Sequence, residues 1–579
     1  MINRDELLKN YMTGNFLNTV YEGYGANCDD RHGFISELAA LHNERSIDIV
    51  EAFESLAENP SDGPDFFLTQ HIFEEVLPSI NAPVLSVMQC VLRLYRSAGQ
   101  DLSSDSIIDA FTTFCAKDPS RPREALKNIE ANPEQLADLL PATIISGSRV
   151  DSLSYLAEAI RLCEDEDIEL RRRAVFSIGE INLPACISSL DLAYTALTRS
   201  IEIETDDQIL ANSVRSVFKL LQQDKTQEPC ASTLIESTLS KGGELTLHAA
   251  SEVFGFHTAE LSVPLIDLLS AHLIHVKSSN KGTLKNIDYG ISHLLKEGDL
   301  EKGIGFLEDL LLEHHNELIM DIFGSTASRI LSNNELISKV LTRWFLRGDR
   351  VLCNAVHKII GTHCGDDLPL EIDPSELKPT DLVHIVFIAR KAIGYLFMRP
   401  ISAASILISL MRHTTEDKIL TELGVLLFDP LLLNYPGTVR EYVTQQSNHV
   451  SSKVKEVLDK TLKDLNDYLD NLRSVGNLVA LHPSEAQREA YHRHFSYLME
   501  ESRKEAEAQS VFLNLVSKCV LLYGRKSINY VHGSDGQSHR MEMPLQNHGI
   551  EIEFPRMESL DPFGLDYTLR MFRNERIKT

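Results

Sequence analysis

A helical phrase recurs along this chain at intervals of about 35 to 40 residues. Its clearest copy runs from Asp167 to Gly179, and every copy carries apolar residues four positions apart. These apolar triplets are Leu170, Ala174 and Ile178; Leu210, Val214 and Phe218; Leu245, Ala249 and Val253; and Val351, Ala355 and Ile359. Their first members are 40, 35 and 106 positions apart, and the last interval is close to three repeats of about 35. A unit this short, with one apolar stripe and a turn expected at its end, must stack on its neighbours to bury that stripe.

The phrase resembles the repeats of HEAT and armadillo-type α-solenoids over roughly half of the chain. The copy beginning at Asp207 lacks the terminal glycine, two others carry it one position later, at Gly255 and Gly361, and residues 285–345 fit the phrase poorly. The resemblance implies a mainly α fold of stacked antiparallel helix pairs, forming a curved scaffold that grips another macromolecule. A fold of this kind does not specify the partner.

Clusters of turn-forming residues and changes of pattern divide the chain into five expected regions. These are an N-terminal helical cap at 1–62, a HEAT-like solenoid at 66–365, further helical units at 366–450, a long helical hairpin at 451–524, and a small β-containing region at 525–579.

The hairpin is expected because leucines at spacings of three and four form one seam between Lys453 and Val475, as in a two-helix contact. Its second helix is predicted to run from Pro483 to Gly524, since no helix breaker lies between them. Beyond it, alternating apolar residues and turn signals predict a small antiparallel β meander. Its expected strands are Ser527–Val531, Met541–Met543 and Ile550–Phe554.

The acidic composition makes nucleic acid an unlikely partner. The chain has 84 acidic and 56 basic residues, a formal net charge of −28, which repels phosphate backbones unless a basic patch is segregated. The basic run Arg171–Arg173 is expected to be neutralised by the acidic residues Glu164–Asp167 just before it.

Cysteine usage and hydropathy favour a cytoplasmic location. Nine scattered cysteines show no secretory spacing, and the N-terminal residues do not form a signal peptide pattern. The most apolar segment, Leu382–Met398, contains His384, Arg390 and Lys391, so we expect a buried helix and no membrane span.

The sequence lacks the common catalytic and nucleotide-binding signatures. It contains no phosphate loop of the form G-x-x-x-x-G-K-[ST], no H-E-x-x-H and no G-x-S-x-G. We therefore expect no cofactor, and a non-enzymatic role ahead of an enzymatic one.

Two sets of residues offer an alternative, metal-binding interpretation. Cys353, His357, His363 and Cys364 lie within twelve positions and could supply two sulfur and two nitrogen ligands to zinc. His532, Asp535, His539 and His548 could converge in the β-containing region. Buried structural cysteines and polar turn residues explain the same positions without a metal.

Two Arg–His pairs resemble the R-x4–6-H motif of HEPN-type ribonucleases. They are Arg350 with His357, and Arg488 with His494. The resemblance implies that Arg binds the scissile phosphate and that His performs acid–base chemistry on the 2′-hydroxyl. The family often has a polar residue after the Arg; Val351 departs from this pattern, and Glu489 matches it only loosely.

The leading interpretation is a non-enzymatic scaffold or adaptor that binds a protein partner. The alternatives are a HEPN-like ribonuclease of a toxin or defence system and, third, a nucleic-acid-binding solenoid similar to HEAT-like DNA glycosylases. The partner or self-association surface is expected at Lys453–Tyr523 and the small sheet after it, because one hairpin cannot hide its whole seam. The other possibility is that the hairpin folds back on residues 382–428 and caps the array.

Overall fold

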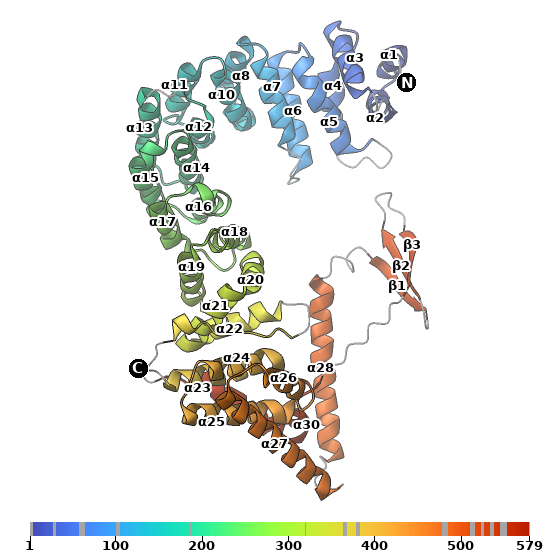
Figure 1. Cartoon of the computed structure of the whole chain (residues 1–579). Helices are drawn as coiled ribbons and strands as arrows, with labels where there is room; N and C mark the ends of the chain where they lie inside the picture. Colours follow the sequence, from blue (N-terminus) through green and yellow to red (C-terminus); the bar gives the residue numbers. More distant parts are fainter. Residues whose placement is uncertain are drawn as a thin grey trace. The chain divides into compact units, whose positions relative to one another are not determined.

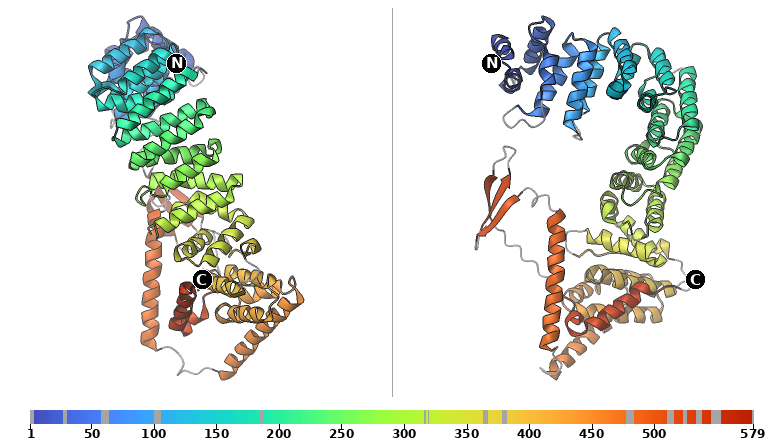
Figure 2. Two further views of the ribbon diagram at one scale, coloured as in Figure 1. Left: turned by 90° about the vertical axis from the view of Figure 1, so that its left-hand side faces the viewer. Right: turned by 180° about the vertical axis from the view of Figure 1, so that it is seen from behind.

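The computed structural model is mainly helical, as the sequence predicts, and its chain divides into two compact units (Figures 1 and 2). Unit 1 comprises Met1–Thr326 and unit 2 comprises Ala327–Thr579, so the division falls within the range expected for the solenoid. The structure describes residues 4–577 except 27–29, 57–63, 100–104, 184–186, 316, 319, 363–366, 378–381, 477–483, 510–515, 523–525, 533–537 and 545–552.

Unit 1 is built from consecutive α-helices. They are α1 (Arg4–Met12), α2 (Phe16–Ala26), α3 (Arg31–Asn43), α4 (Ile49–Glu54), α5 (Phe66–Val76), α6 (Val84–Ala98), α7 (Ser106–Ala116), α8 (Ser120–Ala131), α9 (Pro133–Leu136), α10 (Leu140–Ser148), α11 (Ser152–Leu162), α12 (Ile168–Glu180), α13 (Ile187–Ile203), α14 (Asp207–Gln223), α15 (Glu228–Lys241), α16 (Glu244–His257), α17 (Val263–Leu273), α18 (Lys281–Glu297), α19 (Leu300–Glu313) and α20 (Gly324–Leu331), which crosses the division. Short 3-10 helices lie at η1 (Leu77–Ser79), η2 (Ala137–Leu139), η3 (Lys225–Gln227), η4 (Thr258–Glu260) and η5 (Met320–Ile322).

From α10 onward, the helices of unit 1 form two layers. In the layer that we call the even layer, α10 contacts α12, α12 contacts α14, α14 contacts α16, and α16 contacts α18. In the odd layer, α11, α13, α15 and α17 contact one another in the same order. Figure 1 shows this alternation, with the even layer on the inner side of the arc that these helices follow within unit 1.

The recurring phrase supplies the buried faces of the even helices. Leu170, Ala174 and Ile178 of α12 are buried, as are Leu210, Val214 and Phe218 of α14. In α16, however, the first residue of the triplet, Leu245, is 47% exposed and only Ala249 and Val253 are buried. Leu245 lies in the first turn of its helix, where its backbone N–H group contacts the preceding even helix.

The glycine of the phrase does not form the turn expected there. Gly179 lies inside α12, and a Cβ atom added to it would come within 2.5 Å of the Cα atom of Ser216 on α14. At Gly255 of α16, a Cβ atom would come within 2.4 Å of the backbone oxygen of Asn286 on α18. These glycines therefore allow successive even helices to approach closely, which is their structural role.

Hydrogen bonds reinforce this close approach. The hydroxyl group of Ser216 donates to the backbone oxygen of Val175 at 2.7 Å, and the amide of Asn212 donates to the backbone oxygen of Arg172 at 2.9 Å. Polar side chains are buried at these contacts because backbone carbonyl groups on the neighbouring helix satisfy them.

A carboxylate near the N-terminus of one even helix caps the next even helix. Asp207 on α14 accepts hydrogen bonds from the backbone N–H groups of Gly243 and Leu245, at 2.6 and 2.8 Å, and from the hydroxyl group of Thr246 at 2.6 Å. Partial burial alone would raise the pKa of Asp207, but the hydrogen bonds from Thr246, Gly243 and Leu245 outweigh it and lower this pKa.

A carboxylate also caps the first turn of α20, although this one comes from the middle of the preceding even helix. The buried carboxylate of Asp288, on α18, accepts hydrogen bonds from the backbone N–H groups of Ser325 and Thr326 at 2.9 and 2.8 Å. In both places the donors are the otherwise unsatisfied N–H groups of the first helical turn.

Unit 2 contains the remaining elements. They are α21 (Asn334–Arg347), α22 (Arg350–Gly361), η6 (Pro374–Glu376), α23 (Leu382–Leu396), α24 (Pro400–Arg412), α25 (Asp417–Leu426), the π-helix η7 (Leu427–Leu432), α26 (Thr438–Gln446), α27 (Ser452–Val475), α28 (Glu485–Gln509), β1 (Val516–Leu522), β2 (Lys526–His532), β3 (Ser538–Pro544), α30 (Arg556–Leu560) and α31 (Pro562–Asn574). Helix α23 is the apolar segment that we expected to be buried. Among the described helices of the whole chain, none combines the length and apolar character needed to cross a bilayer.

The predicted hairpin is wrong in its second arm. The seam of α27 buries Val454, Leu458 and Leu465, and α27 packs on α25 and η7. This packing agrees with the alternative in which the segment folds back on residues 382–428. Helix α28 ends at Gln509, and Val516–Leu522 forms strand β1 where the sequence suggested a helix.

The three strands form an antiparallel sheet in the order β1-β2-β3. Two expected strand segments, Ser527–Val531 and Met541–Met543, fall within β2 and β3. The expected third strand, Ile550–Phe554, lies partly outside the described residues, and Phe554 itself is not in a strand. The last two described elements are instead helices, α30 and α31, in a region where only strands were expected.

We predict that Gly179→Ala destabilises the protein by about 1–3 kcal/mol, because the added methyl group would clash with the backbone of α14. The matched control is Gly305→Ala in α19, where a Cβ atom would meet nothing within 4 Å. That substitution should be neutral or stabilise the helix by roughly 0.5–1 kcal/mol. Urea denaturation of the variants measures both effects, and equal stability changes would contradict the assigned role of Gly179.

Candidate protein-interaction surface

Three consecutive arginines of α12 form ion pairs with residues of the neighbouring repeats. Arg171 pairs with Glu204 at 2.7 Å, Arg172 with Asp206 at 2.7 Å, and Arg173 with Asp138 at 2.6 Å. The run is therefore neutralised as predicted, but not by the side chains of Glu164–Asp167. The carboxylate partners of the three arginines come mainly from neighbouring repeats. Among the three, Arg171 also donates hydrogen bonds to the backbone oxygens of Asp165 and Glu166.

These bridges continue toward α16. Arg215 pairs with Glu252 at 2.8 Å, and Lys219 of α14 lies 3.7 Å from Glu180 of α12. In both pairs a cation of α14 meets a carboxylate of an adjacent even helix. These cations are already partly neutralised, so they are poorly suited to hold a phosphate backbone.

Two exposed aromatic side chains lie together on the same layer. Phe256 of α16 is 62% exposed and Tyr289 of α18 is 43% exposed, although both belong to well-packed helices. Their ring centroids are 6.1 Å apart, with the ring planes inclined by 39°. We call these two residues the aromatic pair.

The helices fix the backbone on which the aromatic pair is presented. Gly255, the neighbour of Phe256, lies against the backbone of Asn286, and the Asn286 amide donates to the hydroxyl group of Ser251 at 3.1 Å. Phe256 and Tyr289 are therefore presented by two helices in close contact. The apolar surface that they form is therefore largely pre-organised, and little conformational entropy would be lost from this surface on binding.

Neither residue of the aromatic pair belongs to the recurring pattern. Phe256 follows Gly255 and falls outside the apolar triplet of its helix, and Tyr289 lies where the phrase is poorly matched. The one hint in the sequence was an aromatic residue on the polar side of an amphipathic repeat. The spacing of the repeats does not show which residues of α16 and α18 are neighbours, so it could not show that Phe256 and Tyr289 lie together.

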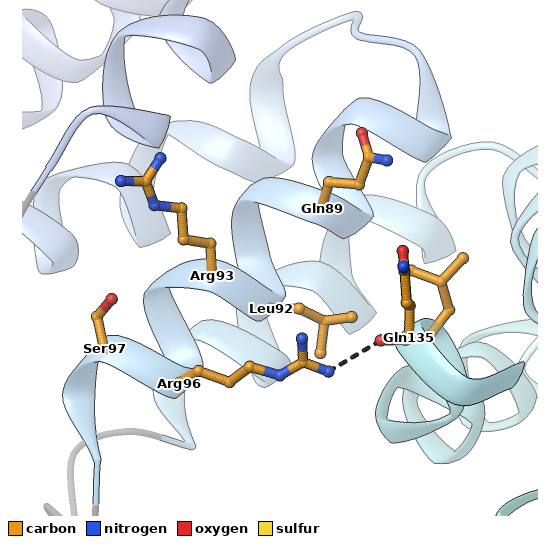
Figure 3. Close-up of a pocket in the computed structure, with 7 residues that line it drawn as sticks. Gln89, Leu92, Arg93, Arg96, Ser97 and Gln135 are labelled. Carbon is orange, nitrogen blue, oxygen red and sulfur yellow. Dashed lines mark hydrogen bonds between the residues drawn. The ribbon is translucent and has the colours of Figure 1, made fainter. Parts of the chain in front are cut away.

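Unit 1 also has a shallow pocket on α6 and α9 that does not resemble an enzyme site. It encloses about 410 Å³ and is lined by Gln89, Leu92, Arg93, Arg96, Ser97, Gln135 and Leu136. Figure 3 shows that the guanidinium groups of Arg93 and Arg96 point away from each other. Arg96 donates to the backbone oxygen of Gln135 at 2.9 Å and lies 3.6 Å from Asp138, so the two arginines do not converge on one ligand.

Arg350 and His357 lie on one face of α22. They are seven positions apart, which corresponds to two helical turns and a rise of about 10 Å, and both are exposed. Desolvation by surrounding atoms lowers the pKa of His357, a hydrogen bond with the backbone of Tyr395 opposes this, and the positive charges of Lys358 and Arg573 lower it further. The imidazole is therefore mainly neutral at pH 7.

Arg488 and His494 both lie on α28. Both side chains are exposed, as are all the other described side chains of this helix. The two residues are six positions apart, which places them on different faces of an α-helix. The structure thus aligns the first Arg–His pair along one face but not the second.

Of the proposed zinc set, the structure describes Cys353 and His357, which lie in different surroundings. Cys353 is buried, and its thiol contacts the backbone oxygen of Trp344 at 3.6 Å, whereas the side chain of His357 on the same helix is exposed. His363 and Cys364 lie outside the described residues, as do Asp535 and His548. No cluster of three or more His, Cys, Asp or Glu side chains suited to a metal occurs among the residues that the structure describes.

Comparisons with known proteins do not place the chain in a family. No family model matches it. No curated protein matches it either. Among solved structures, it is similar to a chain described as a circular tandem repeat protein with novel repeat topology and enhanced subunit contact surfaces. The identity is 14% and the TM-score 0.18, over 81% of this chain and 98% of the other. With a TM-score this low, we base neither fold nor function on the match.

We predict that N-ethylmaleimide labels Cys353 much more slowly than Cys230 in the native protein at pH 8. Burial raises the pKa of the Cys353 thiol to about 12, so almost none of it is the reactive thiolate, whereas Cys230 is exposed. Peptide mass spectrometry should show a difference of about tenfold or more in labelling rate. Equal rates, or protection of Cys353 by added Zn²⁺, would contradict the assignment of Cys353 as a structural residue.

Proposed function

We propose that the protein is a helical-repeat scaffold that binds another protein through the even layer of unit 1. The observation that carries this proposal is the aromatic pair, Phe256 and Tyr289, exposed side by side on two successive helices. Aromatic side chains are enriched among the residues that contribute most to protein–protein binding.

The charges around the aromatic pair support a protein partner over a nucleic acid. Glu252, one helical turn before Phe256 on α16, pairs with Arg215, and Lys219 pairs with Glu180, so the even helices carry charges of both signs as well as the aromatic pair. Protein interfaces commonly combine an apolar centre with a polar rim. The net charge of −28 opposes the approach of a polyanion such as a nucleic acid.

We also propose that the protein is located in the cytoplasm, because its cysteines show no secretory spacing.

A second candidate function is RNA cleavage by Arg350 and His357. One observation favours it: a His with a lowered pKa, neutral at pH 7, can accept a proton from a hydroxyl group. The scaffold role ranks first because two turns of helix separate the Arg and His side-chain positions, and the second pair, Arg488 and His494, is not aligned on one face.

We predict that the double variant Phe256→Ser, Tyr289→Ser loses its protein partner while keeping its fold. The loss of two exposed aromatic side chains should weaken binding by about tenfold or more, since aromatic residues dominate such contacts. The measurement is affinity purification from the native host with quantitative mass spectrometry, followed by direct titration of the purified partner. Leu192→Ser, at a position 57% exposed on α13 of the odd layer, is the matched control.

Two outcomes would contradict the proposed function. One is a set of bound proteins that is the same for wild type, double variant and control. The other is cleavage of labelled RNA by the purified protein that disappears in Arg350→Ala, His357→Ala or in Arg488→Ala, His494→Ala.

A further inference from the structure

The C-terminal helix α31 is held firmly on unit 2 by its inner face. Leu565 and Leu569 are buried, and α31 packs on α23. The ammonium group of Lys391, on α23, is fully buried and donates to the backbone oxygens of Arg573 and Glu575 at 2.6 and 2.7 Å. Apolar packing therefore fixes the helix, and the hydrogen bonds from the buried Lys391 ammonium group fix its C-terminal end.

The chain just before α31 is fixed as well. The carboxylate of Glu553 accepts hydrogen bonds from the backbone N–H groups of Gly437 and Thr438 at 2.8 and 2.6 Å. The backbone N–H group of Met557 donates to the side-chain oxygen of Asn434 at 2.9 Å. Helix α31 is thus a pre-organised element of unit 2.

The outer face of α31 nevertheless exposes a continuous apolar ridge. Phe563 is 87% exposed, Tyr567 66% and Met571 54%. Their spacing of four residues aligns them along one face, opposite the buried Leu565 and Leu569. We call these three residues the ridge.

We propose that the ridge is a self-association surface, where α31 of one copy of this chain packs against α31 of a second copy about a two-fold axis. Such an axis, level with residue 568, reverses the direction of the second helix. It places Met571 of one copy between Phe563 and Tyr567 of the other and keeps the two Tyr567 rings adjacent. Aromatic–aromatic and sulfur–aromatic contacts of this kind are favourable.

The charges beside the ridge are also self-complementary. Asp566 and Arg570 flank it on one side and form an ion pair at 2.8 Å within the helix. About the same two-fold axis, this side of one helix faces the same side of the second helix in reverse order. Asp566 of each copy then lies near Arg570 of the other. The same pair of contacts is therefore made twice, as an isologous interface requires.

The size of the ridge predicts a weak dimer. The exposed parts of the two aromatic rings amount to about 300 Å² per copy, since each ring can bury about 150–250 Å². Twice this area is well below the roughly 1,200 Å² at the lower end of stable interfaces. We therefore expect a monomer–dimer equilibrium that depends on protein concentration. This surface is independent of the aromatic pair on unit 1, and its test does not require the unidentified partner.

Sedimentation velocity of the full chain, from about 1 to 100 µM, tests the proposal. The wild type should shift from monomer toward dimer with concentration, and Phe563→Ser, Tyr567→Ser should weaken dimerisation by about tenfold or more. Val425→Ser, at a position 59% exposed on α25 of the same unit, is the matched control and should behave as the wild type. Thermal unfolding confirms that each variant is folded.

A charge-exchange experiment tests the proposed register. Asp566→Arg places like charges across the axis, as does Arg570→Asp, so each variant alone should dimerise less than the wild type. An equimolar mixture of the two should recover dimerisation, because each Arg then faces an Asp. The proposal is overturned if the wild type remains monomeric throughout, if the ridge variant dimerises as the wild type does, or if mixing the two charge variants restores nothing.

Discussion

The close contact between successive even helices is the constraint on which unit 1 depends. A repeat of this length buries its apolar stripe only against its neighbours, so the backbones of those neighbours must come near one another. Gly179 and Gly255 provide the space, and the hydroxyl group of Ser216 and the amide of Asn286 satisfy polar groups at the same contacts. A capping carboxylate then ties one helix to the first turn of the next, as Asp207 and Asp288 do.

This constraint connects the fold to the proposed function. When the backbones of α16 and α18 are held together, side chains on their exposed faces occupy fixed relative positions. Phe256 and Tyr289 are such side chains, and Glu252, one helical turn before Phe256, pairs with Arg215. A repeat array can in this way present a surface to which residues from separate repeats contribute, and we propose that a protein binds there.

The helical content was predictable because it rests on a local, repeated pattern. The clearest copy of the phrase, Asp167–Gly179, falls on α12, and the expected helix Leu382–Met398 differs from α23 only at its end. The role of Gly179 was not predictable, since a glycine near a helix end is compatible with a turn as well as with a close helix contact. Strand β1 was missed because a short apolar run such as Val516–Leu522 fits a buried helix or a strand equally well, and its pairing with β2 decides the outcome.

The candidate surfaces were less accessible to sequence reasoning than the fold. The Arg–His and Cys–His patterns both fall on α22. Cys353 is buried but His357 on the same helix is exposed, and the described residues contain no cluster of potential metal ligands there. Phe256, Tyr289 and the ridge of α31 were overlooked, because an exposed aromatic residue becomes meaningful only when its neighbours in space are known.

Native-state hydrogen exchange of Asp288→Ala, compared with the wild type, tests most directly the claim that the even helices are coupled through their caps. Loss of the buried carboxylate leaves the N–H groups of Ser325 and Thr326 without their acceptor. We predict faster amide exchange in α18 and α20 and unchanged exchange in α5 to α7, because each repeat contacts only the neighbouring repeats. Unchanged exchange in α20, or equally faster exchange throughout unit 1, would contradict the account.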